Sequence, residues 1–532
     1  MPSMFRLALF VAACAAVGTT AALAQDREPA AGFSRVIVGF KAGAEPGARA
    51  ALVAALVAAR GRVALDLPSV AAVAVELPSA AVAALSRNPN VEFVEEDVKR
   101  YPLALTTPSA NPYASGQLEP WGIRAVQAHL LPLSDALTTN RKVCIIDSGY
   151  AMGHEDLPGS SRVSGYDGNL AWNQDGNGHG THVAGTIAAL NNAGTGVVGV
   201  NAGGYLNLYI VRVFGNDGAW AYSSTLVDAA TRCQSAGANV ISMSLGGSVS
   251  SRAEQTKFQQ LLDANILPIA AAGNGGNSRT SYPAGYASVM SVAAVDVNSL
   301  KASFSQYNKD VEISGPGVGV LSTVPTGKGL LASLNVGGLV VEAFPFEGSA
   351  QVSRSGPLFN FGIGDAVNTG ASGRVCLIAR GTVDFSTKVS NCQASGGLGA
   401  VIYNNEPGAF SGTLGTTITT IPSVSISQED GTALLARTDQ TTTLGVGAAN
   451  YAYYDGTSMA TPHVSAVAAL VWSYFTPAAP TASRSCTATQ LRNSLNKSAK
   501  DLGTAGRDNN FGFGLVQAKA AYDRIVALGC GN

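Results

Sequence analysis

Three polar side chains stand where a folded chain could bring them together. Asp147 ends the apolar run Val143–Ile146, whereas His179 and Ser458 each stand at the start of a helical stretch. In α/β proteins, the carboxyl ends of strands and the helix starts beside them gather at one edge of a sheet. The sequence therefore predicts that an Asp, a His and a Ser converge there.

Such a trio could carry out nucleophilic catalysis. Ser458 would attack, His179 would take and return a proton, and Asp147 would hold the imidazole and stabilise its cation. Taken singly, each residue also has a plainer interpretation: an ordinary strand-end Asp, a two-His metal site with His182, and a helix N-cap Ser. Because no HExxH motif or third ligand lies near the histidines, the three residues together favour the catalytic interpretation.

The elements that must position these residues follow an alternating pattern. Apolar runs rich in Val, Ile and Ala alternate with helical stretches, and such runs are typical of parallel strands buried on both faces. The pattern predicts an α/β fold with a doubly wound parallel sheet. The runs are Lys142–Ile146, Leu206–Val213, Asn239–Met243, Ile266–Ala271 and Val289–Val295.

Composition excludes several classes of protein. With 34 Lys and Arg against 35 Asp and Glu, the formal net charge is -1, so no basic footprint for nucleic acid is present. Hydrophobic residues make up 46% and charged residues 13%, which excludes a disordered chain and a coiled coil. Beyond the N-terminus no unbroken apolar stretch reaches about 18 residues, so we expect no transmembrane span.

The N-terminus has the pattern of a secretory signal peptide. Arg6 precedes the apolar stretch Leu7–Ala22, and Ala22-Leu23-Ala24 is a small-x-small cleavage pattern. We therefore expect residues 1–24 to be removed and the protein to be secreted, extracellularly or into the periplasm. Two alternatives stay open: a lipoprotein anchored at Cys14, and a buried N-terminal helix.

Two further regions precede or interrupt the alternating pattern. Residues 34–103 predict a β-α-β-α-β order, with helices at Gly47–Arg60 and Ser79–Arg87 and strands from Arg35, at Val70–Leu77 and at Val91–Val98. Residues 326–450, called the insert below, are rich in Gly, Ser and Thr and contain short strand-like runs. Because the main pattern resumes after them, we expect the insert to be a β-rich domain within a loop.

Four motifs closely resemble those of the subtilisin-like serine peptidases. They are Ile145–Gly149, Ala270–Asn274, His179–Thr186 and Gly456–His463. The resemblance implies a subtilisin-like doubly wound fold and a serine endopeptidase that acts on proteins or peptides.

The resemblance also implies a role for each residue of the site. Asp147, His179 and Ser458 would form the catalytic triad, and the Asn274 amide would join the Ser458 backbone N–H in an oxyanion hole. A non-catalytic peptide-binding or adhesion protein on the same scaffold is the rival interpretation. The presence of all four residues favours the enzyme.

A substrate cleft between two chain edges is a further implication of the resemblance. Ser244-Leu245-Gly246-Gly247 is similar to one edge and Gly218-Ala219-Trp220 to the opposite edge. Ala271-Ala272-Gly273 and Ser281 would line the primary side-chain pocket. Because none of these residues is charged, we expect cleavage after uncharged, medium-to-large apolar side chains.

By the same resemblance, residues 34–103 are an inhibitory propeptide, which makes the protein a zymogen that processes itself. The propeptide tail would lie in the cleft like a product and be cut within Tyr101–Ala110. The catalytic domain would span 104–325 and 451–532, and the insert would be a protease-associated domain. We expect a monomer whose partners are protein substrates and its own propeptide.

Six of the seven cysteines remain once Cys14 leaves with the signal peptide. An even number in an exported chain without a CxxC pair favours disulfides over zinc. Sequence alone leaves several pairings open. Two pairs would each close a local loop of the chain: Cys376–Cys392 within the insert and Cys486–Cys530 in the last helical segment. This leaves Cys144–Cys233 as the third expected pair.

A calcium site is the last feature that the resemblance implies. His154–Leu157 and Leu190–Asn192 are similar to the family's strong calcium site, with Asp156 and Asn192 as oxygen ligands. A polar surface loop is the alternative interpretation. No organic cofactor is expected.

Overall fold

The computed structural model describes most of the chain beyond residue 31. The predicted signal peptide, including Cys14, lies outside the described residues, and the predicted helix Gly47–Arg60 falls in a stretch of which only single positions are described. The described ranges are 32–41, 61–97, 99–102, 118–131, 135–192, 196–406, 412–477 and 485–531, with single positions between 47 and 54 and at 410.

Seven parallel strands form the central sheet, in the order β14-β13-β12-β10-β6-β8-β7. The five predicted strands are all present, so the prediction of a doubly wound parallel sheet is confirmed. Two strands were missed, because β7 has only 3 residues and β14 contains Ser-Gly-Pro, which is typical of turns. The bounds are β6 Lys142–Asp147, β7 Val163–Gly165, β8 Asn207–Arg212, β10 Val240–Met243, β12 Leu267–Ala271, β13 Met290–Val295 and β14 Ile313–Pro316.

Helices cover both faces of this sheet. On one face lie α4 (His179–Ala188), α9 (Thr457–Tyr474), α10 (Ala488–Ser498) and α11 (Ala518–Leu528), and on the other α5 (Ser223–Ser235) and α6 (Arg252–Asp263). Among the described residues, no helix combines the length and apolarity that crossing a membrane requires.

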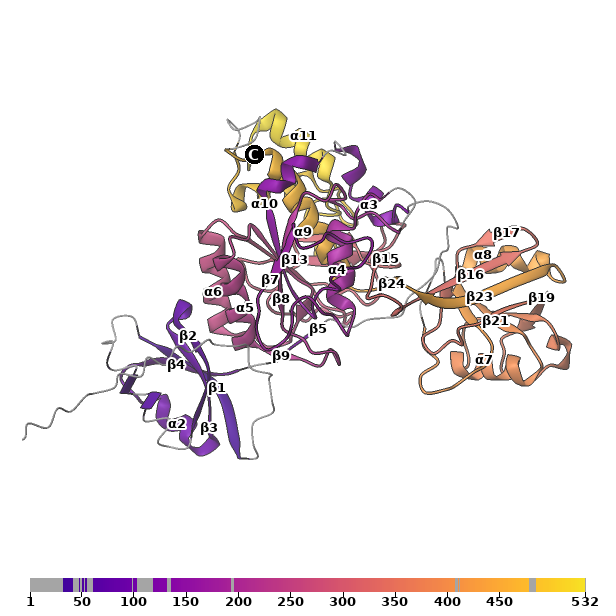
Figure 1. The fold of residues 1–532 in the computed structure, drawn as a ribbon, viewed down its shortest axis with the longest axis horizontal. Coiled ribbons are helices and arrows are strands. Elements are labelled where there is room, and N and C mark those ends of the chain that lie inside the picture. The colour runs from indigo at the N-terminus through magenta and orange to yellow at the C-terminus, as the bar shows by residue number, and fades with distance from the viewer. Residues whose placement is uncertain are drawn as a thin grey trace, which may run out of the picture.

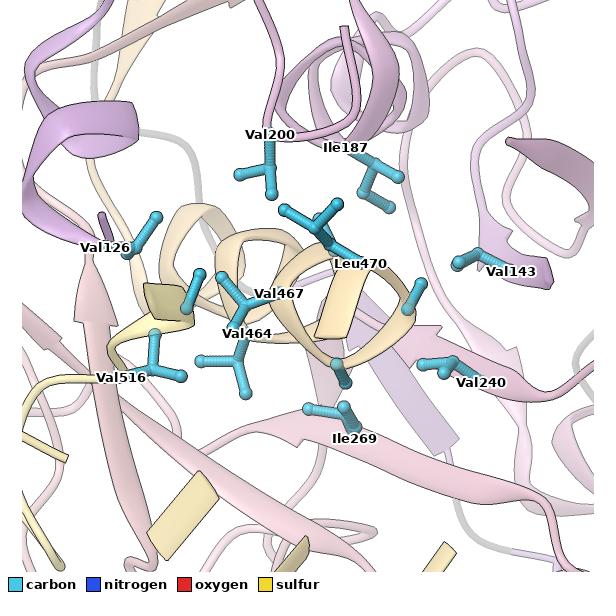
Figure 2. Packing of buried hydrophobic residues seen from close by; sticks show 14 of the residues in the cluster. Val126, Val143, Ile187, Val200, Val240, Ile269, Val464, Val467, Leu470 and Val516 are labelled. Carbon is cyan, nitrogen blue, oxygen red and sulfur yellow. The ribbon is translucent and has the colours of Figure 1, made fainter. Parts of the chain in front are cut away.

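The long helix α9 runs through the core. Its residues from Thr457 to Ser473 are all buried, and most of them are apolar, as expected for a helix in the core. Figure 2 shows Val464, Val467 and Leu470 of α9 packed between Ile269 of the sheet and Ile187 of α4. This packing anchors the helix start that carries Ser458.

The N-terminal segment (residues 33–102) folds on an antiparallel sheet of order β2-β3-β1-β4, drawn in indigo in Figure 1. Strand β2 was not predicted, because its Ala-containing sequence reads as a continuation of the preceding helical stretch. The elements are β1 Phe33–Phe40, β2 Arg62–Leu67, β3 Ala72–Pro78, α2 Ser79–Leu85, β4 Val91–Glu96 and β5 Lys99–Pro102.

The insert forms an eight-stranded sheet of its own, to one side of the catalytic domain in Figure 1. A pair of antiparallel strands, β15 (Val320–Thr323) and β24 (Tyr451–Tyr454), connects the insert to the catalytic domain and is called the stem below. The elements of the insert are β16 Gly329–Val336, β17 Leu339–Val341, β18 Phe344–Pro345, β19 Ser353–Gly362, β20 Val375–Ala379, α7 Phe385–Ala394, β21 Gly399–Tyr403, β22 Ser423–Ile426, α8 Gln428–Leu434 and β23 Thr441–Ala449.

Three disulfides join the six cysteines in the pairs expected from the sequence. Cys144–Cys233 links β6 to α5, Cys376–Cys392 links β20 to α7 of the insert, and Cys486–Cys530 links the segment before α10 to the end of the chain after α11. The first of these disulfides connects the strand that ends at Asp147 to a helix on the opposite face from α4.

Candidate active site

Asp147 and His179 form a buried hydrogen-bonded pair at the carboxyl edge of the sheet. Asp147 is the last residue of β6 and His179 is the first residue of α4. His179 Nδ1 lies 2.7 Å from Asp147 Oδ1, and both residues are fully buried. Because a carboxylate only accepts, Nδ1 carries the proton. His179 Nε2, which makes no hydrogen bond to a described residue, is therefore the ring atom that can accept a proton.

Ser458 lies in the first turn of α9, where it is bonded to the end of a neighbouring strand. Its Oγ donates to the Ser244 carbonyl at 3.2 Å, and Ser244 Oγ donates to the Ser458 carbonyl at 2.7 Å. Ser244 directly follows β10, the strand beside β6. The ends of two adjacent strands and the starts of two packed helices thus hold Asp147, His179 and Ser458 at one edge of the sheet.

Asp175 organises the loop that leads into His179. Its Oδ1 accepts from Gly178 N–H at 2.8 Å and from Ser148 Oγ at 3.0 Å, and its Oδ2 accepts from Thr181 N–H at 2.9 Å. These bonds satisfy N–H groups at the start of α4, which no intrahelical partner can reach. Asp175 therefore fixes the helix end on which His179 sits.

The charges around His179 keep it basic despite its burial. Burial disfavours the imidazolium, but the charge and hydrogen bond of Asp147 and the charge of Asp175 outweigh it, so the pKa of His179 is raised above its ordinary value. His182, one turn further along α4, has no such carboxylate. Burial, the charge of His179 and the charge of His463 lower the pKa of His182 to about 3.

Asn274 is held with its amide group in a defined orientation. Its Oδ1 accepts from Thr457 N–H at 2.9 Å and from Thr457 Oγ1 at 2.7 Å. Since the oxygen faces Thr457, the NH₂ group of Asn274 is turned away from it. Thr457 directly precedes Ser458, so this one residue connects Asn274, the predicted oxyanion donor, to the serine.

The tail of the N-terminal segment lies between two chain edges of the catalytic domain. Strand β5 pairs antiparallel with β11 (Leu245–Gly246) on one side and with β9 (Ala221–Tyr222) on the other. The Leu245-Gly246 edge is the predicted one. On the opposite side the described pairs are made by Ala221 and Tyr222, which follow directly on the predicted Gly218-Ala219-Trp220.

The predicted side-chain pocket lies at the end of β12. Ala271, Ala272 and Ser281 are buried, and Gly273 has a left-handed φ of 111°. Gln306 joins two sides of this region: its backbone N–H donates to Gly273 O at 2.9 Å, and its Nε2 donates to Arg279 O. A Cβ at Gly273 would overlap the Gln306 side chain, so glycine is required there.

The predicted calcium ligands also lie together. Asn192 Nδ2 donates to Asp156 Oδ1 at 3.0 Å, and Val197 N–H donates to Asp156 Oδ2 at 2.7 Å. Burial raises the pKa of Asp156 to about 7, against the lowering effect of these hydrogen bonds. Besides burial, the groups that act on the Asp156 carboxyl are Val197, Asn192 and the like-charged Glu155, with no Lys or Arg among them. Within the described ranges, no cluster of three His, Cys, Asp or Glu residues suits a metal ion.

Three residues near the site were missed in the sequence. Asp175 could have been found, because an Asp shortly before a helix start is a capping signal. Thr457 and Gln306 carry no such signal, since their roles depend on partners that are 183 and 27 residues away in the chain.

Comparisons with known proteins match this architecture region by region. The sequence model of the subtilase family matches residues 138–335, the PA domain model matches 348–434, and the Fervidolysin N-terminal prodomain model matches 33–97. The N-terminal segment is thus a prodomain and the insert contains a PA domain.

Individual relatives agree with the family models. Subtilisin DY from Bacillus licheniformis is 39% identical over 252 residues, covering 44% of this chain and 89% of the relative. Alkaline elastase YaB from Bacillus sp. (strain YaB) is 38% identical over 247 residues, covering 46% and 60%.

Solved structures extend the match beyond the catalytic domain. The psychrophilic subtilisin-like protease Apa1 from Pseudoalteromonas sp. AS-11 has a TM-score of 0.66 and 41% identity, covering 77% of this chain and 99% of that one. Fervidolysin from Fervidobacterium pennivorans shares the fold, with a TM-score of 0.59 and 23% identity over 92% of this chain and 61% of that one. Given the parallel sheet, the buried Asp–His pair and the identity to Subtilisin DY, this chain belongs to the subtilase family and is a serine endopeptidase.

Proposed function

We propose that the protein is an exported, self-processing endopeptidase in which Asp147, His179 and Ser458 form the catalytic triad. The observation that carries this proposal is the 2.7 Å contact between His179 Nδ1 and Asp147 Oδ1, with both groups buried beside the serine-bearing helix. That contact orients His179 so that Nε2 is the proton acceptor.

The reaction then follows from the roles of these groups. Ser458 Oγ attacks the substrate carbonyl carbon while His179 Nε2 takes its proton, and Asp147 stabilises the imidazolium. The Asn274 amide and the Ser458 backbone N–H receive the negative charge on the carbonyl oxygen. His179 next protonates the leaving amine, and a water molecule, activated by the same histidine, hydrolyses the acyl-enzyme.

Substrate recognition is proposed to rely on backbone pairing. An extended peptide would add between the Ser244-Leu245-Gly246 edge and the Gly218–Tyr222 edge, as β5 does, which tolerates many sequences. The neutral residues Ala271, Gly273 and Ser281 favour Leu, Phe, Tyr or Met before the cut bond. A cleavage profile dominated by Arg and Lys, or by Asp and Glu, would contradict this pocket.

Export and self-processing are part of the proposal. The signal pattern at residues 1–24, the three disulfides and the similarity to subtilisins support an extracellular or periplasmic location. We propose a prodomain over 34–103, a catalytic domain over 104–325 and 451–532, and an insert over 326–450. Strand β5 pairs with both of the proposed substrate edges, which supports a cut close to Leu103 in the same molecule through proximity.

Calcium is proposed as a structural ion held by Asp156 and Asn192. A buried carboxylate without a cationic side chain, beside an amide that could present its oxygen, suits a hard cation with oxygen ligands. The ion would stabilise this loop by compensating the buried charge. A lower melting temperature in EDTA, restored by added calcium and absent in Asp156→Asn, would support the site, and an unchanged melting temperature would exclude it.

Labelling with a serine-directed fluorophosphonate tests the triad. We expect the mature protein to be labelled at Ser458 and nowhere else, and His179→Ala to abolish labelling because the serine loses its base. Labelling that persists at full rate in His179→Ala would show that the triad is assigned wrongly.

A further inference from the structure

The stem of the insert is directly bonded to the helix that carries His179. The imidazole of His182, three residues after His179, lies against both stem strands: its Nε2 is 2.9 Å from Val320 O of β15 and 3.0 Å from Ala452 O of β24. Both partners are carbonyl oxygens, so Nε2 carries the proton and donates to the two strands at once. His182 Nδ1 is buried and makes no hydrogen bond to a described residue.

Further contacts join the same two elements. Ser322 Oγ donates to His182 O at 2.8 Å, and Thr323 Oγ1 donates to Thr181 O at 3.0 Å. The Tyr454 ring stacks on the His182 imidazole with centroids 4.4 Å apart. A Cβ at Gly185 would overlap the Ser322 and Thr323 hydroxyls, so the close approach of α4 to β15 depends on glycine.

The residues that flank the stem are also bonded to each other just before α9, the helix that carries Ser458. Gly319 N–H, just before β15, donates to Asp455 Oδ1 at 2.6 Å, and Gly456 N–H donates to Gly317 O at 2.8 Å. Asp455 and Gly456 directly follow β24 and precede the first turn of α9. The stem strands therefore contact the helix of the base, and the residues directly flanking them hold the loop that leads into the helix of the nucleophile.

We propose that His182 is a positioning residue for catalysis, which ties both stem strands to α4 and thereby keeps His179 aligned with Ser458. The inference rests on the proposed roles of His179 and Ser458. It assigns the stem a role beyond carrying the insert: it is a brace between the two catalytic helices. Burial lowers the pKa of His182 to about 3, so the neutral ring, with its proton on Nε2, makes both bonds.

The test compares mature variants on a peptide p-nitroanilide with Leu before the cut bond. His182→Phe keeps a ring beside Tyr454 but loses the Nε2 donor, and we expect kcat to fall about 10- to 100-fold while KM changes less than about 3-fold. His182→Gln can place an amide N–H near the same carbonyls, so it should recover most of kcat. Leu495→Ala, in α10, which packs mainly against α9, α11 and β12, creates a core cavity and is the matched control for lost stability.

The outcomes separate positioning from mere stability. A fall in kcat for His182→Phe, recovery in His182→Gln and unchanged kcat in Leu495→Ala support the inference. Unchanged kcat in His182→Phe, or a fall no larger than that of Leu495→Ala at equal melting temperature, overturns it.

If His182→Phe fails to accumulate, Thr323→Val, which removes only the bond to Thr181 O, is judged by the same criterion. Fluorophosphonate labelling of the parent tests the triad separately: absent labelling refutes the triad, whereas normal labelling with unchanged kcat in His182→Phe refutes only the positioning role.

Discussion

The prodomain and the insert both extend the catalytic domain, but they are attached to it in different ways. Besides the backbone pairing of β5 with β11 and β9, the prodomain uses carboxylates: Asp97 accepts from the Ser224 N–H of α5 at 2.8 Å, and Glu95 accepts from the Arg252 N–H of α6 at 2.8 Å. Arg35, which is almost fully buried, pairs with Asp97 at 2.7 Å. Carboxylates at helix N-termini are favourable there because they compensate unpaired N–H groups.

The insert, by contrast, is connected through continuous backbone. Its two connecting strands pair with each other from Val320↔Tyr454 to Thr323↔Tyr451, and their carbonyls bond His182. No proteolytic step is needed to complete this arrangement. The difference teaches that a single cut would leave the prodomain held by noncovalent contacts alone, whereas the insert stays joined to the catalytic domain through both of its ends.

The largest effect is expected from Ser458→Ala. The variant removes the nucleophile with little change in volume, so the fold should remain while kcat falls by at least about 10⁴-fold. The protein should accumulate as a soluble, signal-cleaved precursor with the prodomain still attached, whereas the parent chain should begin near Ala104. N-terminal sequencing checks this, and a Ser458→Ala chain cut at the parent site in a host without other exported proteases would contradict self-processing.

Weakening the prodomain contacts should reduce inhibition without touching the triad. Asp97→Ala removes the nearer ion-pair partner of the buried Arg35, which keeps Glu76 at 3.8 Å, and it removes the acceptor for the Ser224 N–H. Breaking a buried ion pair costs about 3–5 kcal/mol, so inhibition of the mature enzyme by added prodomain should weaken at least about 100-fold. Glu96→Ala, at an exposed position of the same strand, is the control and should inhibit like the parent. Equal inhibition constants for the two variants would show that the buried ion pair does not hold the prodomain.

The pH dependence of kcat/KM should change when a charged group near His179 is removed. Its pKa is raised above the ordinary 6.5, so kcat/KM should fall on the acid side with an apparent pKa above that value. Asp175→Asn keeps a hydrogen-bond acceptor but removes one charge, which should move the acid limb to lower pH; Asp263→Asn, on α6, should not move it. Protonated His179 stabilises the folded protein at pH values below the pKa of this residue in the unfolded chain. This stabilisation is lost as the pH rises through the higher pKa of His179 in the folded protein. An acid limb that stays in place in Asp175→Asn would contradict this account.

The smallest effect on the chemistry is expected from removing the insert. Deleting 326–450 and joining Pro325 to Tyr451 through Asn-Gly keeps β15 and β24 paired, so kcat/KM on a small peptide should stay within about 3-fold of the parent. The choice among protein substrates should change. The mature variant's kinetics check this, and an insoluble or unfolded product, with the parent soluble under the same conditions, would show that the insert is needed for folding.

Much of the proposed catalytic site was predictable from local sequence. Asp147 follows an apolar strand, and His179 and Ser458 open helices, and each of these signals lies within about ten residues. The five strands with apolar sequences were predictable for the same reason, since buried parallel strands are mostly apolar. Short or turn-like strands such as β7 and β14 were not, because their pairing depends on β8 and β13 rather than on their own composition.

By itself, the sequence determined which residue types stand at the strand ends and helix starts, and hence the chemistry they can perform. Only the tertiary structure decided which groups surround them. Gln306 meets Arg279, and His182 meets Val320 and Ala452, across 27, 138 and 270 residues of chain. The physical reason is that strand and helix periodicity is a short-range property, whereas a hydrogen bond to a distant carbonyl exists only once the whole sheet and its helices have packed.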